Sequence, residues 1–153
     1  MSEEQAQVGR LPFQIETQYV KDLSFENPNF LSKSAEDKAQ PEMGVNVETQ
    51  VAKLEGGRYE VSMDISVKAS LGGDAMFVLE LTYAALVAVA EGLDRAALEN
   101  ILLVHCPFLI FPFAREIVSN MTRCGGYPPL MIEPVDFAAV YMAKKKEMEG
   151  KGA

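Results

Sequence analysis

The residues best suited to chemistry gather in one stretch of the chain. His105 and Cys106 are neighbours, and the second of the two cysteines is Cys124. A base and a nucleophile that act together normally come from separate parts of a fold, because adjacent residues at a helix start point apart. One histidine and two distant cysteines also fall short of a usual zinc ligand set. We therefore expect no catalysis, no metal site and two reduced thiols.

Two glycine pairs, Gly56-Gly57 and Gly72-Gly73, lack the GK[ST] sequence of a phosphate-binding loop and are typical of hairpin turns. No cofactor is expected. The net charge of −8 argues against nucleic acid as a partner, since phosphate backbones are bound by clustered cations. A binding partner should be neutral or basic.

Length and composition favour one domain over residues 1–153, with tails at 1–11 and 146–153. The N-terminus lacks the basic start and apolar run of a secretory signal, which predicts a cytoplasmic protein. The longest uncharged stretches are shorter than the ~20 apolar residues of a spanning helix, so direct membrane insertion is not expected.

The elements that carry these residues follow from hydrophobic periodicity. A long alternating strand is expected over 13–26, and mostly polar residues then form a crossover up to Pro41. Three further strands are expected near 43–51, 59–69 and 75–90, joined by the glycine hairpins. The fold class predicted is α+β: a four-stranded antiparallel sheet, with a crossover after strand one and helices packed on one face.

Helices are expected in the second half of the chain. Asp94 suits the N-cap of a helix that ends near Val104, and Pro107 suits the start of the next one. Pro112 implies a kink or a second start, and Gly125-Gly126 ends the helix. A last helix is expected from Pro134. The apolar side of the central helix comprises Ile110, Phe113, Ala114, Ile117, Val118 and Met121.

Alternation assigns side chains to two faces of the sheet. In the first strand, Phe13, Ile15, Thr17, Tyr19, Leu23 and Phe25 are expected to face the core. The opposite parity forms an acidic surface, which ordinarily serves solubility. Its members are Glu16, Asp22, Glu26, Glu48, Glu60, Asp64 and Glu80, with Arg58 and Lys68.

The strand near 75–90 breaks the alternation, since it is apolar on both sides and Glu80 is its one charge between Ala75 and Ala90. An antiparallel sheet with one wet face should alternate cleanly. Either a second subunit or the chain's own helices could cover the additional apolar surface. Both explanations remain open from the residues alone.

Two runs of sequence carry a family resemblance: CPFLIFPFAREIVSNMTRCGGYPPLMIEPVDFAAVYM and YVKDLSFENPNF. Here the chain resembles the bacterial protein-export chaperone family SecB. The resemblance extends over roughly residues 13–142. It implies a homotetramer, a dimer of dimers, that holds unfolded precursor proteins without ATP and delivers them to the translocation motor SecA.

The resemblance also implies roles for particular positions. Contact with SecA is implied for Asp22, Glu26, Val78 and Glu80, which all have the parity of the acidic surface. A client-binding groove is implied for Phe25, Phe30, Met43, Val45, Val47, Phe137 and Tyr141. Subunit interface or core is implied for Phe77, Leu79, Leu81, Phe113, Ile117 and Met121. The family carries a tryptophan where this chain has Ala39, so we expect a shallower aromatic part of the groove.

A second hypothesis comes from another functional class. An α+β protein with this layout could instead be an oligomer that binds a small apolar ligand between sheet and helices. Binding of a fluorescent fatty acid without affinity for unfolded chains would favour it.

Overall fold

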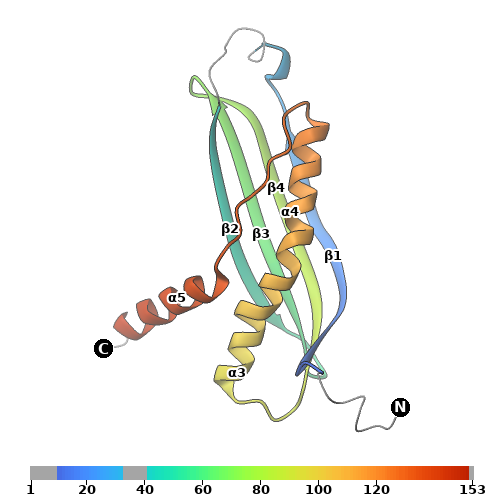
Figure 1. The fold of residues 1–153 in the computed structure, drawn as a ribbon, viewed down its shortest axis with the longest axis vertical. Helices are drawn as coiled ribbons and strands as arrows, with labels where there is room; N and C mark the ends of the chain where they lie inside the picture. Colours follow the sequence, from blue (N-terminus) through green and yellow to red (C-terminus); the bar gives the residue numbers. More distant parts are fainter. Residues whose placement is uncertain (1–9, 33–40, 152–153) are drawn as a thin grey trace.

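The computed structural model describes residues 10–32 and 41–151, and it is built around one twisted antiparallel sheet (Figure 1). Its strands are β1 (Phe13–Glu26), β2 (Glu42–Lys53), β3 (Arg58–Leu71) and β4 (Asp74–Val89), in the spatial order β1-β4-β3-β2. All three pairings are antiparallel. The expected α+β class is confirmed. Most of the expected N-terminal tail and the crossover position Ala39 lie outside the described residues.

The two hairpins form where the glycine pairs stand. Gly72 and Gly73 connect β3 to β4 with φ angles of 61° and 85°, a region that side chains with a Cβ rarely adopt. The sequence therefore located both turns, because the turn geometry itself requires glycine.

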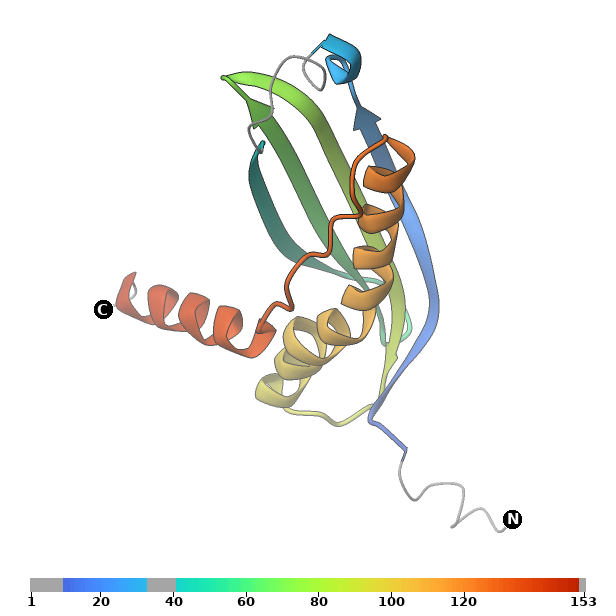
Figure 2. The same cartoon turned by 45° about the horizontal axis from the view of Figure 1, so that its top comes forward.

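One continuous helix runs from Arg95 to Cys124 across the inner face of the sheet (Figures 1 and 2). It comprises α3 (Arg95–Asn100), the π-helical turn η1 (Ile101–His105) and α4 (Cys106–Cys124). Asp94 caps it as expected, accepting a hydrogen bond from the Ala97 N–H at 2.7 Å.

The expected helix boundary at Pro107 was wrong. In η1 the N–H of Cys106 bonds to the carbonyl of Ile101, so the turn contains one more residue than an α-helical turn. A widened turn lets the helix pass a proline ring, which in a regular α-helix clashes with the carbonyl four residues earlier. Pro112 lies inside α4 and starts no second helix.

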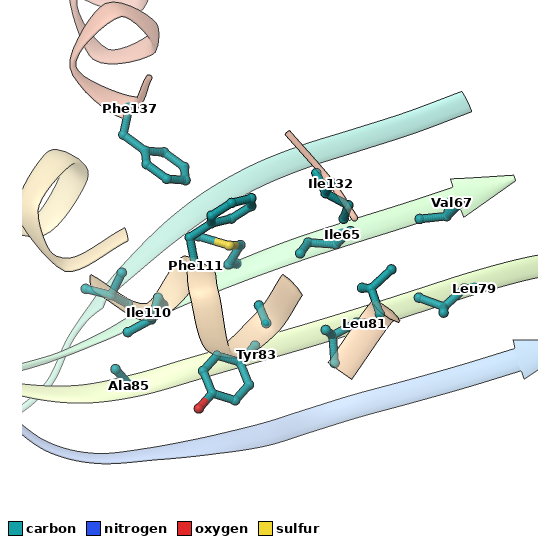
Figure 3. Close-up of a cluster of buried hydrophobic side chains, with 14 of the residues drawn as sticks. Ile65, Val67, Leu79, Leu81, Tyr83, Ala85, Ile110, Phe111, Ile132 and Phe137 are labelled. Carbon is teal, nitrogen blue, oxygen red and sulfur yellow. The ribbon is translucent and has the colours of Figure 1, made fainter. Parts of the chain in front are cut away.

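The core lies between the inner face of β3 and β4 and the sheet-facing side of α4 (Figure 3). Ile110, Ala114 and Val118 of α4 are fully buried there, as are Ile65 and Leu79 of the sheet. Burying each of the larger side chains, from valine upward, contributes roughly 1.5–3 kcal/mol before conformational entropy is subtracted. The chain's own helix therefore covers the inner side of β4.

Phe77, Leu79 and Leu81, expected at an interface or in the core, are at most 2% exposed within this one chain. The helix Arg95–Cys124 is long and apolar enough to cross a membrane by length and composition. Because α4 packs its apolar side on the sheet, we interpret this helix as the core helix of the domain.

After α4, residues 125–136 pass over the sheet to α5 (Phe137–Lys151), which projects away from the body (Figures 1 and 2). Asp136 caps α5 by accepting a hydrogen bond from the Ala139 N–H at 3.0 Å. The helix thus begins three residues after Pro134. It also continues to Lys151, through positions where a tail was expected from residue 146.

Candidate functional site

The outer face of the sheet contains residues that simple alternation assigned to the core. The register of β1 against β4 shifts at positions 16 and 21, and each shift reverses the parity of the strand. Thr17 and Tyr19 therefore lie on the outer face, which corrects the sequence prediction. The Tyr19 hydroxyl accordingly donates a hydrogen bond to Glu60 across β4. Sequence alternation does not reveal bulges.

Beyond the second shift the expected parity returns, and the four residues with an implied role in SecA contact share the outer face. The register pairs Glu26 with Val78, and it places Asp22 and Glu80 nearby on the same two strands. Asp22, Glu26 and Glu80 are exposed, and Val78 is half-buried. Within the part of the chain that the structure describes, these three carboxylates form no ion pair. We call these four residues the acidic patch.

Two other carboxylates of the outer face form ion pairs. Lys21 binds Glu60 at 2.8 Å, and Arg58 binds Glu16 at 3.2 Å. The hydrogen bonds from Lys21 and Tyr19 lower the pKa of Glu60. Burial, and then the bond to Glu60, raise the pKa of Tyr19 to about 12. The carboxylates of the acidic patch have no ion-pair partner among the described residues, although Lys68 on β3 lies opposite Val78 in the register.

An aromatic cluster stands where β1 ends against the end of α4. The ring centroids of Phe25 and Phe77 are 5.6 Å apart, and those of Phe30 and Tyr127 are 5.4 Å apart. Phe77 and Tyr127 join these pairs at 4.9 Å. A Cβ at Gly125 would lie 2.5 Å from the Phe25 ring, so this close packing requires glycine. Sequence reasoning named Phe25 and Phe30 but missed Tyr127.

The edge strand β2 carries the second group of expected groove residues. Met43 and Val45 are 43% and 42% exposed on the inner face, and Val47 is half-buried. The register places them opposite the buried Ala69, Val67 and Ile65 of β3. We call Met43, Val45 and Val47 the β2 strip. It extends the apolar inner face beyond the part that α4 covers.

The third group lies at α5. Phe137 is buried against Phe111, with ring centroids 6.0 Å apart, so it belongs to the core. Tyr141 donates a hydrogen bond to Glu99 at 2.6 Å, which raises the Tyr141 pKa and lowers that of Glu99. Between α3 and α5 lies a cavity of about 590 Å³. Its lining includes Thr49, Ala96, Leu103, Val140, Tyr141, Lys144, Lys145 and Met148.

The structure does not gather all the expected groove residues at one point. The aromatic cluster lies beside the C-terminal end of the helix Arg95–Cys124, whereas Tyr141 lies beside α3 at the N-terminal end of that helix. Phe137 packs against α4 itself. The β2 strip follows the edge of the sheet. The three groups are therefore spread along an elongated surface that runs from the end of α4 to α3 and to the edge of the sheet.

The side of α4 away from the sheet is apolar as well. Phe113 is 54% exposed, and Ile117 and Met121 are half-buried. Phe108 and Leu109, which sequence reasoning did not select, extend this row and are also exposed. We call these five residues the α4 stripe. The sequence analysis assigned the α4 stripe residues Phe113, Ile117 and Met121 to the same apolar side as Ile110 and Ala114. In the structure the sheet covers only the part of that side formed by residues such as Ile110 and Ala114.

His105 and the two cysteines do not form a catalytic group. Burial raises the pKa of the Cys106 thiol to about 12, while Cys124 is exposed at the other end of α4. The His105 ring stacks on Phe13 with centroids 6.4 Å apart, and its Nε2 lies 3.1 Å from the amide nitrogen of Asn100. Among the described residues, no group of three or more potential metal ligands is present.

Comparisons with known proteins give a consistent result. Residues 4–148 match the family model described as preprotein translocase subunit SecB. The chain is 42% identical over 143 residues to the protein-export protein SecB of Parvibaculum lavamentivorans, covering 93% of this chain and 84% of that protein. It is 38% identical over 148 residues to that of Caulobacter vibrioides, covering 97% and 90%.

A solved structure shares the fold at low sequence identity. A SecB-like chaperone of Mycobacterium tuberculosis, in complex with an antitoxin peptide, superposes with a TM-score of 0.66 at 18% identity. The alignment covers 81% of this chain and 91% of that one. The family resemblance is thereby confirmed by sequence and the architecture by structure. The chain belongs to the SecB family of cytoplasmic, non-enzymatic protein-export chaperones, which deliver precursor proteins to SecA.

Proposed function

We propose that this chain acts as a homotetrameric holdase that separates its two partners on the two faces of one sheet. Unfolded precursors occupy the elongated apolar surface of the inner face, and SecA contacts the acidic patch of the outer face. The single observation behind this assignment is the division of the sheet: the β2 strip is apolar and partly exposed, while the acidic patch on the opposite face carries three exposed carboxylates without an ion pair among the described residues.

Exposed apolar residues support the client site. Soluble proteins rarely leave neighbouring apolar side chains open without a binding role. Met43 and Val45 on β2 and the aromatic cluster at the end of β1 are apolar surfaces of different shapes, and such a combination tolerates many sequences. No nucleotide enters the proposed mechanism, because client release requires only competition for this surface.

The first experiment compares capture of folded and unfolded chains. Light scattering behind size exclusion, without nucleotide, should show a species near four subunits that retains a permanently unfolded polypeptide and ignores its folded counterpart. A monomer that is indifferent to both would contradict the proposal.

The second experiment tests the acidic patch. Glu80→Lys or Asp22→Ala should weaken SecA binding at low salt and leave client binding unchanged, since exposed charges mainly act through screened, longer-range attraction. Glu48→Lys is the matched control, because Glu48 is an exposed carboxylate on the same outer face, on β2. Equal loss of both binding activities in Glu80→Lys would show that the faces are not separate sites.

The α4 stripe supports the oligomer. Its exposed phenylalanines would be covered if two chains packed their α4 helices together, and burying each would contribute roughly 1.5–3 kcal/mol. Phe113→Asp should therefore dissociate the tetramer at micromolar concentration in sedimentation velocity. Glu48→Lys, on the outer face of the sheet, should leave it intact. A tetramer that persists in Phe113→Asp would place the interface elsewhere.

The cavity between α3 and α5 is the feature that favours the second candidate, a small apolar ligand. Its volume of about 590 Å³ lies within the range of ~300–1,000 Å³ typical of ligand pockets. Saturable binding of a fluorescent fatty acid, lost in Tyr141→Ala and unaffected by an unfolded client, would support this role. Competition between fatty acid and client would instead identify the cavity as part of the client surface.

A further inference from the structure

One wall of the cavity between α3 and α5 changes from apolar to cationic along α5. Phe137 and Val140 line the cavity in the first turn of this helix, whereas Lys144 and Lys145 line it about two turns after Phe137. With a rise of about 1.5 Å per residue, Lys144 lies roughly 10 Å beyond Phe137 along the helix axis. Phe137 is buried and both lysines are exposed. This wall is therefore apolar at its inner end and positively charged at its outer end.

The opposite wall, formed by the helix Arg95–Cys124, shows the same change of character. Leu103 lines the cavity from the half-buried part of this helix, and Arg95 lines it roughly 12 Å away, at the exposed start of α3. Phe137 packs on Phe111, which follows Leu103 in the same helix. The apolar ends of the two walls therefore lie together.

Glu99 is one of two carboxylates that line the cavity, and its charge is already compensated. The Tyr141 hydroxyl donates to it at 2.6 Å and the Arg95 guanidinium at 2.9 Å, and these two bonds lower the Glu99 pKa. A carboxylate that is paired in this way repels an anionic ligand less than an unpaired one does.

The two lysines at the outer end are not compensated in this way. Among the described residues, neither Lys144 nor Lys145 forms an ion pair. The Lys145 ammonium lies 5.9 Å from the ring centroid of Tyr141, which also lines the cavity. The second lining carboxylate, Glu149, is exposed one turn further along α5. Apart from the pair formed by α3, two lysines thus accompany one carboxylate here, on a chain with a net charge of −8.

We propose that this cavity binds an anionic amphiphile, with its alkyl chain against Leu103, Phe137 and Val140 and its acidic head group on Lys144 and Lys145. This inference rests on the second candidate function, a small apolar ligand, and specifies the chemical class of that ligand. The apolar end removes the alkyl chain from water, and the lysines form charge-assisted hydrogen bonds with the head group. A fatty acid is the simplest molecule with this composition.

Titration calorimetry with ligands of one chain length tests the head group. Below their micellar concentrations, decanoate and decyl sulfate should bind at least about fivefold more tightly than decanol, and decyltrimethylammonium should bind most weakly. High salt should weaken decanoate binding and leave decanol binding nearly unchanged. Equal affinity for decanoate and decanol would overturn the inference and retain an apolar ligand site. If none of the four ligands binds, the second candidate function fails as well.

Matched lysine variants locate the head group. Lys144→Gln and Lys145→Gln should each weaken decanoate binding about threefold to tenfold and change decanol binding less than about twofold. Lys146→Gln is the control, because Lys146 is exposed on the same helix and does not line the cavity. Equal weakening by all three variants would show that decanoate responds only to the general charge of α5, which would overturn the assigned site.

A substitution in the first turn of α5 locates the alkyl chain. Val140→Asn should weaken decanoate and decanol alike, about fivefold, because it places a polar group against the chain. Val140 is 42% exposed, so the fold does not depend on its burial. Met142→Asn is the control, since Met142 is exposed on α5 outside the cavity lining. Unchanged decanoate binding in Val140→Asn would overturn the proposed orientation.

Anionic phospholipids carry a related head group, and vesicles distinguish them from a free amphiphile. The protein should sediment no more with phosphatidylglycerol vesicles than with phosphatidylcholine vesicles, because an alkyl chain must leave its bilayer before it can enter the cavity. Vesicle binding that is lost in Lys144→Gln, without any binding of free decanoate, would identify a membrane surface as the partner and overturn the inference.

Discussion

The two edge strands of the sheet are built in opposite ways. β1 is interrupted by two register shifts, and its side chains reach past their neighbours: Lys21 and Tyr19 bind Glu60 on β3. Its end is tied to the helix, since the Asn27 amide donates to the Gly125 carbonyl at 2.9 Å. β2 has an unbroken register. Its one described side-chain hydrogen bond joins Asn46 to Glu48 within the strand itself.

This difference separates β1, whose side chains stabilise the fold, from β2, whose surface can adapt to different partners. The bonds of β1 hold specific partners, namely Glu60 on the outer face and Gly125 and Tyr127 beside the aromatic cluster. β2 is held mainly by its backbone ladder to β3, and its apolar side chains remain exposed. An edge without specific side-chain contacts can accept many partners, because nothing in it must be displaced first. The following predictions test this contrast, from the largest expected effect to the smallest.

Leu54 donates to the Arg58 carbonyl at 2.9 Å and the register of β2 is unbroken, so the even-numbered residues of β2 bond to β3 and the odd-numbered residues direct their N–H groups away from it. Proline substitutions should distinguish the two sets. Asn46→Pro removes an N–H that bonds to β3 and leaves a carbonyl without its donor, so the free energy of unfolding should fall by about 1–3 kcal/mol. Val45→Pro should cost less than about 1 kcal/mol. Urea unfolding at fixed protein concentration measures both. Equal losses would show that the inferred phase of the ladder is incorrect.

Asparagine truncation should affect the two edges unequally. Asn27→Ala removes the bond to Gly125 and also the acceptor of the Tyr127 hydroxyl, which lies at 2.6 Å. We expect a loss of about 1–2 kcal/mol in the free energy of unfolding. Asn46→Ala on β2 should change it by less than about 0.5 kcal/mol. A larger effect at Asn46 would reverse the contrast.

The bonds of β1 to Glu60 should make part of its stability dependent on pH. Hydrogen bonds from Lys21 and Tyr19 lower the Glu60 pKa below its usual 4.5. The folded state therefore gains stability above the ordinary pKa and loses it as pH falls through the lowered one. Glu60→Gln should cost less than about 1 kcal/mol at pH 7, as expected for a largely solvated pair. Thermal unfolding should show this difference shrinking as the pH falls below 4.5, and a difference that grows in acid would contradict the assignment.

Thiol labelling should detect the same contrast through the rate at which the buried thiol becomes accessible. At pH 8 an alkylating reagent should modify exposed Cys124 rapidly and Cys106 slowly, since Cys106 is buried and its pKa is raised to about 12. Asn27→Ala, which loosens the contact between β1 and α4, should speed labelling of Cys106 by a few-fold. Asn46→Ala should leave that rate unchanged. Mass spectrometry of quenched samples provides the rates.

Sequence reasoning succeeded where a local rule determines structure. The hairpins followed from glycine, the Asp94 cap from its side chain, and the acidic patch from parity beyond the second bulge. Thr17 and Tyr19 were misplaced because a bulge is a property of two paired strands and leaves no mark in the composition of one. Phe113 was grouped with Ile110 because hydrophobicity alone cannot indicate which apolar residues meet the sheet.

The assignment of residues to groove or core depended on tertiary contacts. Phe137 became core because Phe111 packs on it, whereas Val45 stayed exposed because α4 does not extend over the edge of the sheet. Both are apolar residues with a polar neighbour in the sequence, Asp136 before Phe137 and Asn46 after Val45. Only the distance of each from the helix distinguishes them.

The π-helical turn η1 makes the orientation of α3 relative to α4 sensitive to the number of residues between them. A regular α-helix rotates by about 100° per residue, so the one additional residue in η1 turns everything after it by that amount. This offset allows α3 to border the cavity beside α5 while Ile110, Ala114 and Val118 face the sheet. The number of residues between Asp94 and Cys106 thus determines the rotation of α3 relative to α4. Deleting one residue of η1 would rotate α3 relative to α4 without changing the composition of either helix.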